Sequence, residues 1–306
     1  MSATTIDQTG LGDRVVASAR GLTMRFGSVT ALEDVTFDLR ENTIYGLLGR
    51  NGAGKTTLMQ VLTGQMFQTS GEVRIHGAIP HENAGVLQNV SFIKESQSYP
   101  ADYKVEHVLR AARHLLPHWD EDFARELLAD FDLPTGRKVK KLSRGMTSAL
   151  GVIIGLASRA PLTFFDEPYL GLDAVARQLF YDRLLADYAE HPRTVVLSTH
   201  LIDEVADLLE HVVLIDRGRI LADASADELR ASAIGLSGPV DEVETVVAGR
   251  PVLRRETLGN QARVLLRTDA HADDTAHAKT LGLTVAPVSL QQLIVETTNL
   301  QGKEQR

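Results

Sequence analysis

Apolar and polar positions alternate along residues 15–235 in a way that predicts strands interleaved with helices. Short apolar runs typical of buried strands occupy residues 15–19, 35–39, 44–48, 70–75, 90–93, 162–165 and 194–199. From Lys94 to about Ser158 the apolar residues recur at helical spacing instead. Strands that alternate with helices are typical of an α/β fold. We therefore predict an α/β domain over residues 14–235, with a helical subdomain at about 94–158.

The pattern changes after Ser237-Gly238-Pro239, where the elements become short and mixed. We expect helices at 240–247, 275–281 and 290–297 and a strand at 263–267. Residues 236–306 are therefore predicted to form a small α+β domain, to which we assign no chemistry. At the other end of the chain, residues 1–13 are polar and are predicted to be a flexible lead-in.

The stretch from Gly49 to Thr57, Gly-Arg-Asn-Gly-Ala-Gly-Lys-Thr-Thr, lies between a predicted strand and a predicted helix. In that setting it matches the phosphate loop, whose glycines let backbone N–H groups converge on phosphate oxygens. Lys55 is expected to reach the β- and γ-phosphates and Thr56 to offer its hydroxyl to Mg²⁺. The alternative is a glycine-rich turn before an ordinary helix. We assign nucleotide contacts to Asn51, Gly52, Ala53, Gly54, Lys55, Thr56 and Thr57.

Two carboxylates, Asp166 and Glu167, follow directly after the apolar run at 162–165. The carboxyl end of such a strand is where an α/β sheet presents ligands to Mg²⁺ and phosphate. We predict that Asp166 is a metal partner and that Glu167 is the base for the attacking water. An acidic turn at a strand end is the alternative. His200 ends the next apolar run and can donate to a γ-phosphate, although a lone histidine is more often structural.

Two further features are ambiguous when the residues are taken alone. Ser143 stands where a helix N-cap belongs, with Gly145 behind it and lysines at 138, 140 and 141 before it. That arrangement suits an anion and suits a solvated basic turn equally well. Phe26 could stack on adenine, but a packing role is favoured for a single aromatic residue.

Composition narrows the class of protein. The chain has 306 residues, a net charge of −8 and no cysteine. The absence of cysteine excludes disulfides and thiol catalysis, and the acidic balance argues against a nucleic-acid partner. No uninterrupted apolar run reaches the roughly 18 residues of a membrane helix, and the polar start lacks the pattern of a signal peptide. These features agree with a cytosolic address.

Taken in order, the motifs resemble those of the ATPase subunits of ABC transporters. Over residues 14–235 the chain matches their Walker A, signature, Walker B, D-loop and H-loop motifs at 49–57, 142–146, 162–167, 170–173 and 200. The resemblance implies a phosphate-loop NTPase core of ABC ATPase type with an antiparallel β subdomain and a helical subdomain. It also implies ATP and Mg²⁺ as cofactors, hydrolysis of ATP, and an adenine-stacking role for Phe26.

The same resemblance implies how the protein assembles. In this family two copies face each other, and each ATP lies between the phosphate loop of one copy and the signature of the other. Ser143, Gly145 and the D-loop residue Asp173 are therefore expected to contact nucleotide of the second cassette. The chain is similar to bacterial exporter subunits of the drug, antibiotic-resistance or bacitracin type. These act with a separate membrane permease at the cytoplasmic, inner face of the cell membrane. We expect no nucleic-acid partner.

The chain departs from the family pattern in its signature and in its Q-loop. The signature usually reads Leu-Ser-Gly-Gly-Gln, whereas this chain has Arg144 and Met146 at its third and fifth positions. In the Q-loop, Glu95 stands where glutamine is usual and Gln97 follows two residues later, so either could meet Mg²⁺. A soluble, non-transport ABC ATPase of DNA repair or of the ribosome is the alternative function. A single cassette without a heptad run disfavours it.

Overall fold

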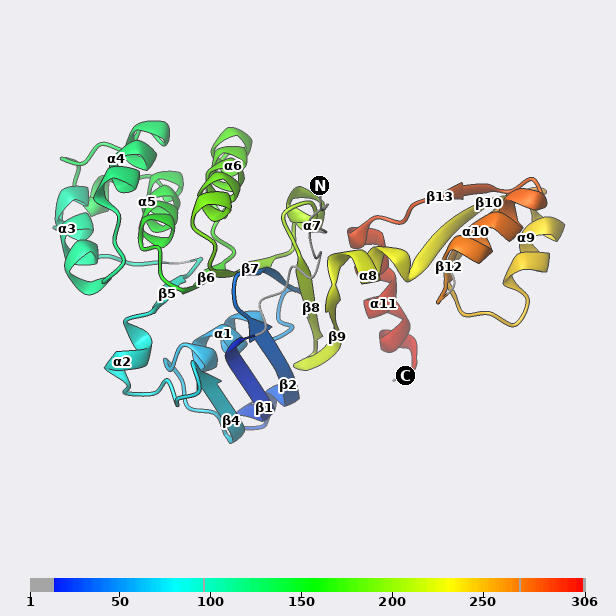
Figure 1. Cartoon of the computed structure of the whole chain (residues 1–306), viewed down its shortest axis with the longest axis horizontal. Helices are drawn as coiled ribbons and strands as arrows, with labels where there is room; N and C mark the ends of the chain where they lie inside the picture. Colours follow the sequence, from blue (N-terminus) through cyan, green and yellow to red (C-terminus); the bar gives the residue numbers. More distant parts are fainter. Residues whose placement is uncertain (1–13, 96, 270, 305–306) are drawn as a thin grey trace, which may run out of the picture. The chain divides into compact units, whose positions relative to one another are not determined.

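The computed structural model describes residues 14–95, 97–269 and 271–304 (Figure 1). The predicted flexible segment 1–13 lies outside the described residues. The chain forms two compact units. One contains the residues up to His200 together with Ile215–Leu221, and the other contains Leu201–Leu214 and Ala222–Arg306.

The first unit contains a three-stranded antiparallel sheet with the order β2-β1-β4. Its strands are β1 (Val15–Phe26), β2 (Val29–Arg40) and β4 (Ser70–Ile75). The predicted antiparallel β subdomain is therefore confirmed. β1 is longer than the apolar run at 15–19 indicates because register shifts along its pairing with β2 let the strand continue to Phe26.

The larger sheet has the strand order β5-β6-β7-β3-β8-β9. Its parallel strands are β5 (Val90–Ile93), β6 (Leu162–Asp166), β7 (Thr194–Thr199) and β3 (Ile44–Leu48). All residues of β3, β6 and β7 are buried, as expected for parallel strands that are covered on both faces. β8 (His211–Asp216) and β9 (Arg219–Ser225) are joined by Arg217 and Gly218, both with positive φ.

Because β3, β6 and β7 are parallel, the residues that follow them lie at one edge of the sheet. The phosphate loop, Glu167 and His200 are brought together in this way. Helix α1 (Lys55–Leu62) starts at the end of the phosphate loop, and α6 (Ala174–Glu190) connects β6 to β7. The short helices α2 (Ala84–Leu87) and α7 (Ile202–Val205) precede β5 and β8.

The helical subdomain contains α3 (Val105–Leu115), α4 (Glu121–Asp130), the 3₁₀ helix η1 (Val139–Lys141) and α5 (Arg144–Ala157). Asp120 caps α4 as the sequence indicates, by accepting a hydrogen bond of 2.8 Å from Phe123 N. Leu115 departs from the predicted apolar stripe, since it lies at the last turn of α3 and is 74% exposed. Gly155 lets α5 approach the sheet, because a Cβ there would lie 2.4 Å from the Phe165 ring.

The C-terminal residues fold as an α+β unit, as predicted. Its elements are α8 (Ala226–Ala231), β10 (Ala233–Pro239), α9 (Val240–Val247), β11 (Val252–Leu258), β12 (Gln261–Arg267), α10 (His271–Thr280), β13 (Thr284–Ala286) and α11 (Leu290–Glu304). From β10 to β13 the order is β-α-β-β-α-β, and the antiparallel sheet has the order β11-β12-β10-β13. This is the split β-α-β, or ferredoxin-like, arrangement. The expected domain boundary between residues 235 and 236 falls inside β10.

The burial pattern of this unit explains why the sequence predicts only some of its helices and strands. Buried residues of β10, β12, α9 and α10 form one cluster, which includes Leu236, Val243 and Leu266. β11 lies at the edge of the sheet and exposes five of its seven residues, so its sequence lacks the apolar alternation of a strand. None of the helices in the described ranges is long and apolar enough to span a membrane.

Candidate functional site

The glycines of the phosphate loop and the start of helix α1 leave backbone N–H groups free to bind an anion. Gly54 precedes the helix with a φ of 111°, a left-handed conformation that glycine adopts readily. A Cβ at Gly49 would lie 2.1 Å from Ile215 O, so the backbones approach too closely for any side chain. Within the described residues no side chain caps α1, so the N–H groups of its first turn stay available to phosphate oxygens.

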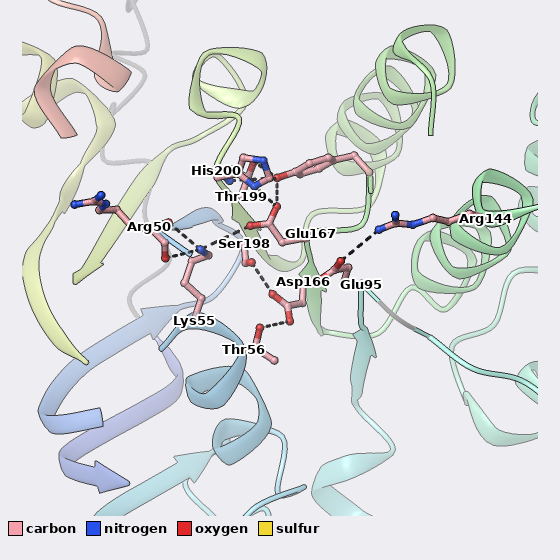
Figure 2. A network of polar contacts seen from close by, with 12 residues as sticks. Arg50, Lys55, Thr56, Glu95, Arg144, Asp166, Glu167, Ser198, Thr199 and His200 are labelled. Carbon is pink, nitrogen blue, oxygen red and sulfur yellow. Dashed lines mark hydrogen bonds and ion pairs between the residues drawn. The ribbon is translucent and has the colours of Figure 1, made fainter. Parts of the chain in front are cut away.

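A cavity of about 600 Å³ opens in front of this loop. It gathers residues from the phosphate loop and from the ends of β5, β6 and β7, which are far apart in the sequence (Figure 2). It is lined by Ala31, Asn51, Gly52, Ala53, Gly54, Lys55, Thr56, Thr57, Glu95, Asp166, Glu167, Leu170 and His200. Most of the residues to which the sequence assigns nucleotide or metal contacts therefore meet in one place.

Asp166 and Thr56 form the part of the site that suits a magnesium ion. The Thr56 hydroxyl donates to Asp166 Oδ2 at 2.7 Å, and the Ser198 hydroxyl donates to Asp166 Oδ1 at the same distance. Both carboxylate oxygens are thus held in place, and Asp166 is only 2% exposed. Among the described residues no cluster of three or more acidic, histidine or cysteine side chains could bind a metal alone. One carboxylate and one hydroxyl fit Mg²⁺, which commonly takes its remaining ligands from phosphate and water.

Lys55 lines the cavity, and its ammonium group is turned to its own loop. Its Nζ donates to Gly49 O at 2.8 Å and to Arg50 O at 3.3 Å, and it lies 3.7 Å from Glu167 Oε1. Burial lowers the pKa of Lys55, while the charges of Glu167 and Asp166 act in the opposite direction. The lysine therefore balances the charge of the carboxylates in this structure (Figure 2). Its contact with phosphate stays a prediction.

Glu167 has the backbone conformation of a residue under local strain. Its φ is 49°, which is uncommon for a residue with a side chain and costs on the order of 1–3 kcal/mol. His200 Nδ1 lies 2.8 Å from Glu167 Oε2, and the hydroxyl of Tyr169 donates to the same oxygen. The structure thus joins the two residues predicted to be catalytic, and it adds a tyrosine that sequence reasoning missed.

The remaining predicted contacts lie outside this cavity. Ser143 accepts a hydrogen bond of 3.1 Å from Met146 N and caps its own helix α5. Asp173 likewise caps α6, by accepting from Ala176 N at 2.8 Å. Gly145 lies against the turn that precedes Asp173, since a Cβ there would lie 2.7 Å from Gly171 O. Phe26 ends β1 and is 46% exposed.

The two candidates for the Q-loop position differ in placement. Glu95 lines the cavity, and its Oε1 lies 3.5 Å from Arg144 Nη2 (Figure 2). Gln97 does not line the cavity, and its side-chain oxygen accepts a hydrogen bond of 3.4 Å from Lys94 N. This placement favours Glu95 for the Q-loop position. Its contact with Mg²⁺ stays a prediction.

One cavity is lined by a phosphate loop, by two carboxylates at the end of β6 and by a histidine at the end of β7. This combination defines a phosphate-loop ATPase. Comparison with known proteins narrows the class. Residues 32–170 match the family model described as ABC transporter. The chain is 32% identical over 257 residues to the Nod factor export ATP-binding protein I of Ralstonia nicotianae, covering 80% of this chain and 77% of the relative.

Two further comparisons agree. The chain is 28% identical to the daunorubicin resistance ATP-binding protein DrrA3 of Streptomyces coeruleorubidus, over 84% of this chain and 90% of that one. The ATP-binding cassette MJ0796, solved as a post-hydrolysis dimer bound to ADP and Pi, shares its fold. The TM-score is 0.60 at 20% identity, over 69% of this chain and 98% of the cassette. The chain belongs to the ABC transporter ATP-binding proteins and is an ATPase subunit of the exporter type.

Proposed function

We propose that this cassette closes head to tail with a second cassette around two ATP molecules and that hydrolysis drives export through a separate membrane permease. The observation that supports the proposal most directly is that the cavity of one chain contains only some of the residues expected to contact nucleotide. The cavity holds Lys55, Asp166 and Glu167, whereas Ser143 and Asp173 lie outside it. A cassette of this family therefore needs a second chain to present its signature to the nucleotide. The dimeric structure of MJ0796, which has a similar fold, supports the pairing of two cassettes.

The residues around the cavity have distinct parts in the proposed reaction. Thr56 and Asp166 would hold Mg²⁺, with Glu95 as a further oxygen ligand, and bound Mg²⁺ would supply positive charge that stabilises the transferring phosphoryl group. Lys55 exchanges its loop carbonyls for phosphate oxygens. Glu167 takes a proton from the attacking water, and His200 donates to the γ-phosphate.

The proposal places the protein in the cytoplasm, at the inner face of the membrane that holds the permease. Its test is reconstitution of the chain in lipid vesicles with the product of a neighbouring reading frame that encodes about six apolar spans. ATP hydrolysis should rise when the permease is present and should depend on Mg²⁺. A soluble, non-transport ATPase would show no such stimulation, and that result would overturn the proposal.

The surface that receives the permease is expected in the stretch from Glu95 to about Leu133. In this stretch Tyr103 is 47% exposed and Leu115 is 74% exposed, although burying large apolar side chains is energetically favourable. The loop that carries Tyr103 is held in place by its neighbour Asp102, which accepts a hydrogen bond of 2.7 Å from Lys140. A permease helix that covers this surface would bury Leu115 in the complex.

Replacing Leu115 with glutamate should therefore weaken the permease complex about tenfold or more, because a charge would be buried in an apolar contact. Co-purification with the permease and permease-stimulated hydrolysis measure the effect, and the basal ATPase should be unchanged. Leu258→Glu is a matched control, since Leu258 is 86% exposed on β11 of the other unit. Loss of basal activity with co-purification retained would place the docking surface elsewhere.

A further inference from the structure

Tyr169 is a buried residue that the reaction described above does not use. It lies in the turn that follows Glu167 and is 2% exposed. Its hydroxyl accepts hydrogen bonds from the Thr199 hydroxyl at 2.9 Å and from the backbone N of His200 at 3.2 Å. It donates to Glu167 Oε2. One side chain thus connects the end of β7 to the residue that follows β6.

These bonds use the whole capacity of the hydroxyl. A phenol has one proton to donate and two lone pairs that accept, and all three are occupied here. With both lone pairs engaged by Thr199 and the His200 backbone, the proton has two acceptors within reach, Glu167 Oε2 and His200 Nδ1, the latter 3.1 Å from the hydroxyl. Because a carboxylate only accepts, the contact of 2.8 Å between His200 Nδ1 and Glu167 Oε2 requires the ring proton on Nδ1, so the tyrosine proton goes to Glu167. Burial raises the pKa of Tyr169, and its hydrogen bond to Glu167 raises it further, so the hydroxyl stays a donor across the working range of pH.

These bonds also give the two oxygens of the Glu167 carboxylate different surroundings. Oε2 is held by Tyr169 and by His200 Nδ1, the latter at 2.8 Å. Oε1 carries no such anchor in the described structure and lies 3.7 Å from Lys55 Nζ, on the side of the phosphate loop. The backbone of Glu167 is itself in a left-handed conformation, so the side chain depends on its neighbours for its direction.

We propose that Tyr169 is a positioning residue for hydrolysis, which clamps Oε2 of Glu167 to the His200 backbone so that Oε1 is the oxygen that takes the proton from water. The inference rests on the proposed roles of Glu167 and His200. It extends them by adding a residue that fixes the distance between the base and the histidine. No atom of Tyr169 needs to touch the nucleotide.

The test is Tyr169→Phe, which keeps the buried ring and removes the hydroxyl alone. A hydrogen bond to a charged group is removed, so kcat should fall roughly 10–100-fold. The KM for ATP should stay within about twofold, because the phosphate loop is untouched. Nucleotide affinity, measured with a fluorescent ATP analogue, should be unchanged.

Tyr45→Phe is the matched control. Tyr45 is 1% exposed in β3, and its hydroxyl accepts a hydrogen bond of 2.7 Å from Arg40 N, so the same chemical change is made at a buried site that does not contact Glu167. Its kcat and KM should match those of the wild type. Should Tyr169→Phe be too unstable to purify, Thr199→Val removes one of the donors that orient the hydroxyl and should lower kcat to a smaller degree, with the KM for ATP unchanged.

A double variant separates this inference from the role of Glu167 itself. If Tyr169 acts through Glu167, Glu167→Gln with Tyr169→Phe should hydrolyse ATP no more slowly than Glu167→Gln alone. Additive losses, or an unchanged kcat in both Tyr169→Phe and Thr199→Val, would overturn the positioning role and leave the base assignment standing. Hydrolysis at the wild-type rate in Glu167→Gln would instead overturn the base assignment.

Discussion

Replacing Glu167 with glutamine should slow ATP hydrolysis about 10²–10⁴-fold and leave ATP binding intact, since a general base typically contributes that much. The amide keeps the shape of the side chain and can still accept the hydrogen bonds of Tyr169 and His200. It cannot take a proton from water. Because product formation is blocked while the phosphate loop is unchanged, ATP should hold two cassettes together for longer than in the wild type.

Three measurements check this expectation: phosphate release, nucleotide affinity, and molecular mass by size-exclusion chromatography with ATP and Mg²⁺. Glu33→Gln is a suitable control, because Glu33 is an exposed glutamate whose partner is Arg219, at 2.7 Å. It should hydrolyse ATP at the wild-type rate and elute as the wild type does. If Glu167→Gln retains wild-type phosphate release, Glu167 is not the base.

The phosphate loop, Asp166, Glu167 and His200 could be predicted because their placement follows from local sequence. Each stands directly after an apolar run, and parallel strands bring such positions to one edge. Ser198 could not be predicted in the same way. It meets Asp166 because β6 and β7 pair in a register that puts Asp166 opposite Ser198, and register is a property of the sheet.

Tyr169 illustrates a second limit of the sequence. A tyrosine two residues beyond Glu167 is indistinguishable from a packing residue until the turn is built. Its bonds to Thr199 and His200 depend on the neighbouring strand. Leu115 illustrates the opposite case, since it continues an apolar stripe in the sequence but lies at the end of α3, where nothing in the described chain covers most of it.

The two departures from the family pattern meet in the structure. Arg144 replaces the third residue of the usual signature, Glu95 replaces the usual glutamine, and their charged groups lie 3.5 Å apart. Both side chains are substantially exposed, so the pair adds little to stability. Its effect is on charge, because Arg144 partly neutralises the carboxylate of Glu95 at the edge of the cavity.

Lys55→Ala and Ser143→Ala should both lose ATP hydrolysis but for different reasons, and a mixture of the two variants should recover activity. Lys55 serves nucleotide bound to its own chain, so its loss should weaken ATP binding to the monomer about 10–100-fold, the range of a hydrogen bond to a charged group. Ser143 lies outside the cavity of its own chain, so Ser143→Ala should bind ATP as the wild type does and yet fail to hydrolyse it.

Stability has to be matched before the two variants are compared. Ser143 caps α5 through Met146 N, and the loss of such a cap costs about 1 kcal/mol. Ser225→Ala is the control, because Ser225 caps α8 by accepting a hydrogen bond of 3.1 Å from Glu228 N in the other unit. It should lower the unfolding temperature to a similar extent and leave hydrolysis unchanged.

The mixture then tests whether the site is shared. In a dimer of one Lys55→Ala chain and one Ser143→Ala chain, one site lacks both groups and the other has both. An equal mixture should recover at most about a quarter of the wild-type rate, because half of the dimers are mixed and each has one complete site of two. Neither variant alone should reach that rate at the same total concentration. Equal loss of ATP affinity in the two monomers, or no recovery when nucleotide-bound mixed dimers are shown to form, would mean that Ser143 does not act on the nucleotide of a second cassette.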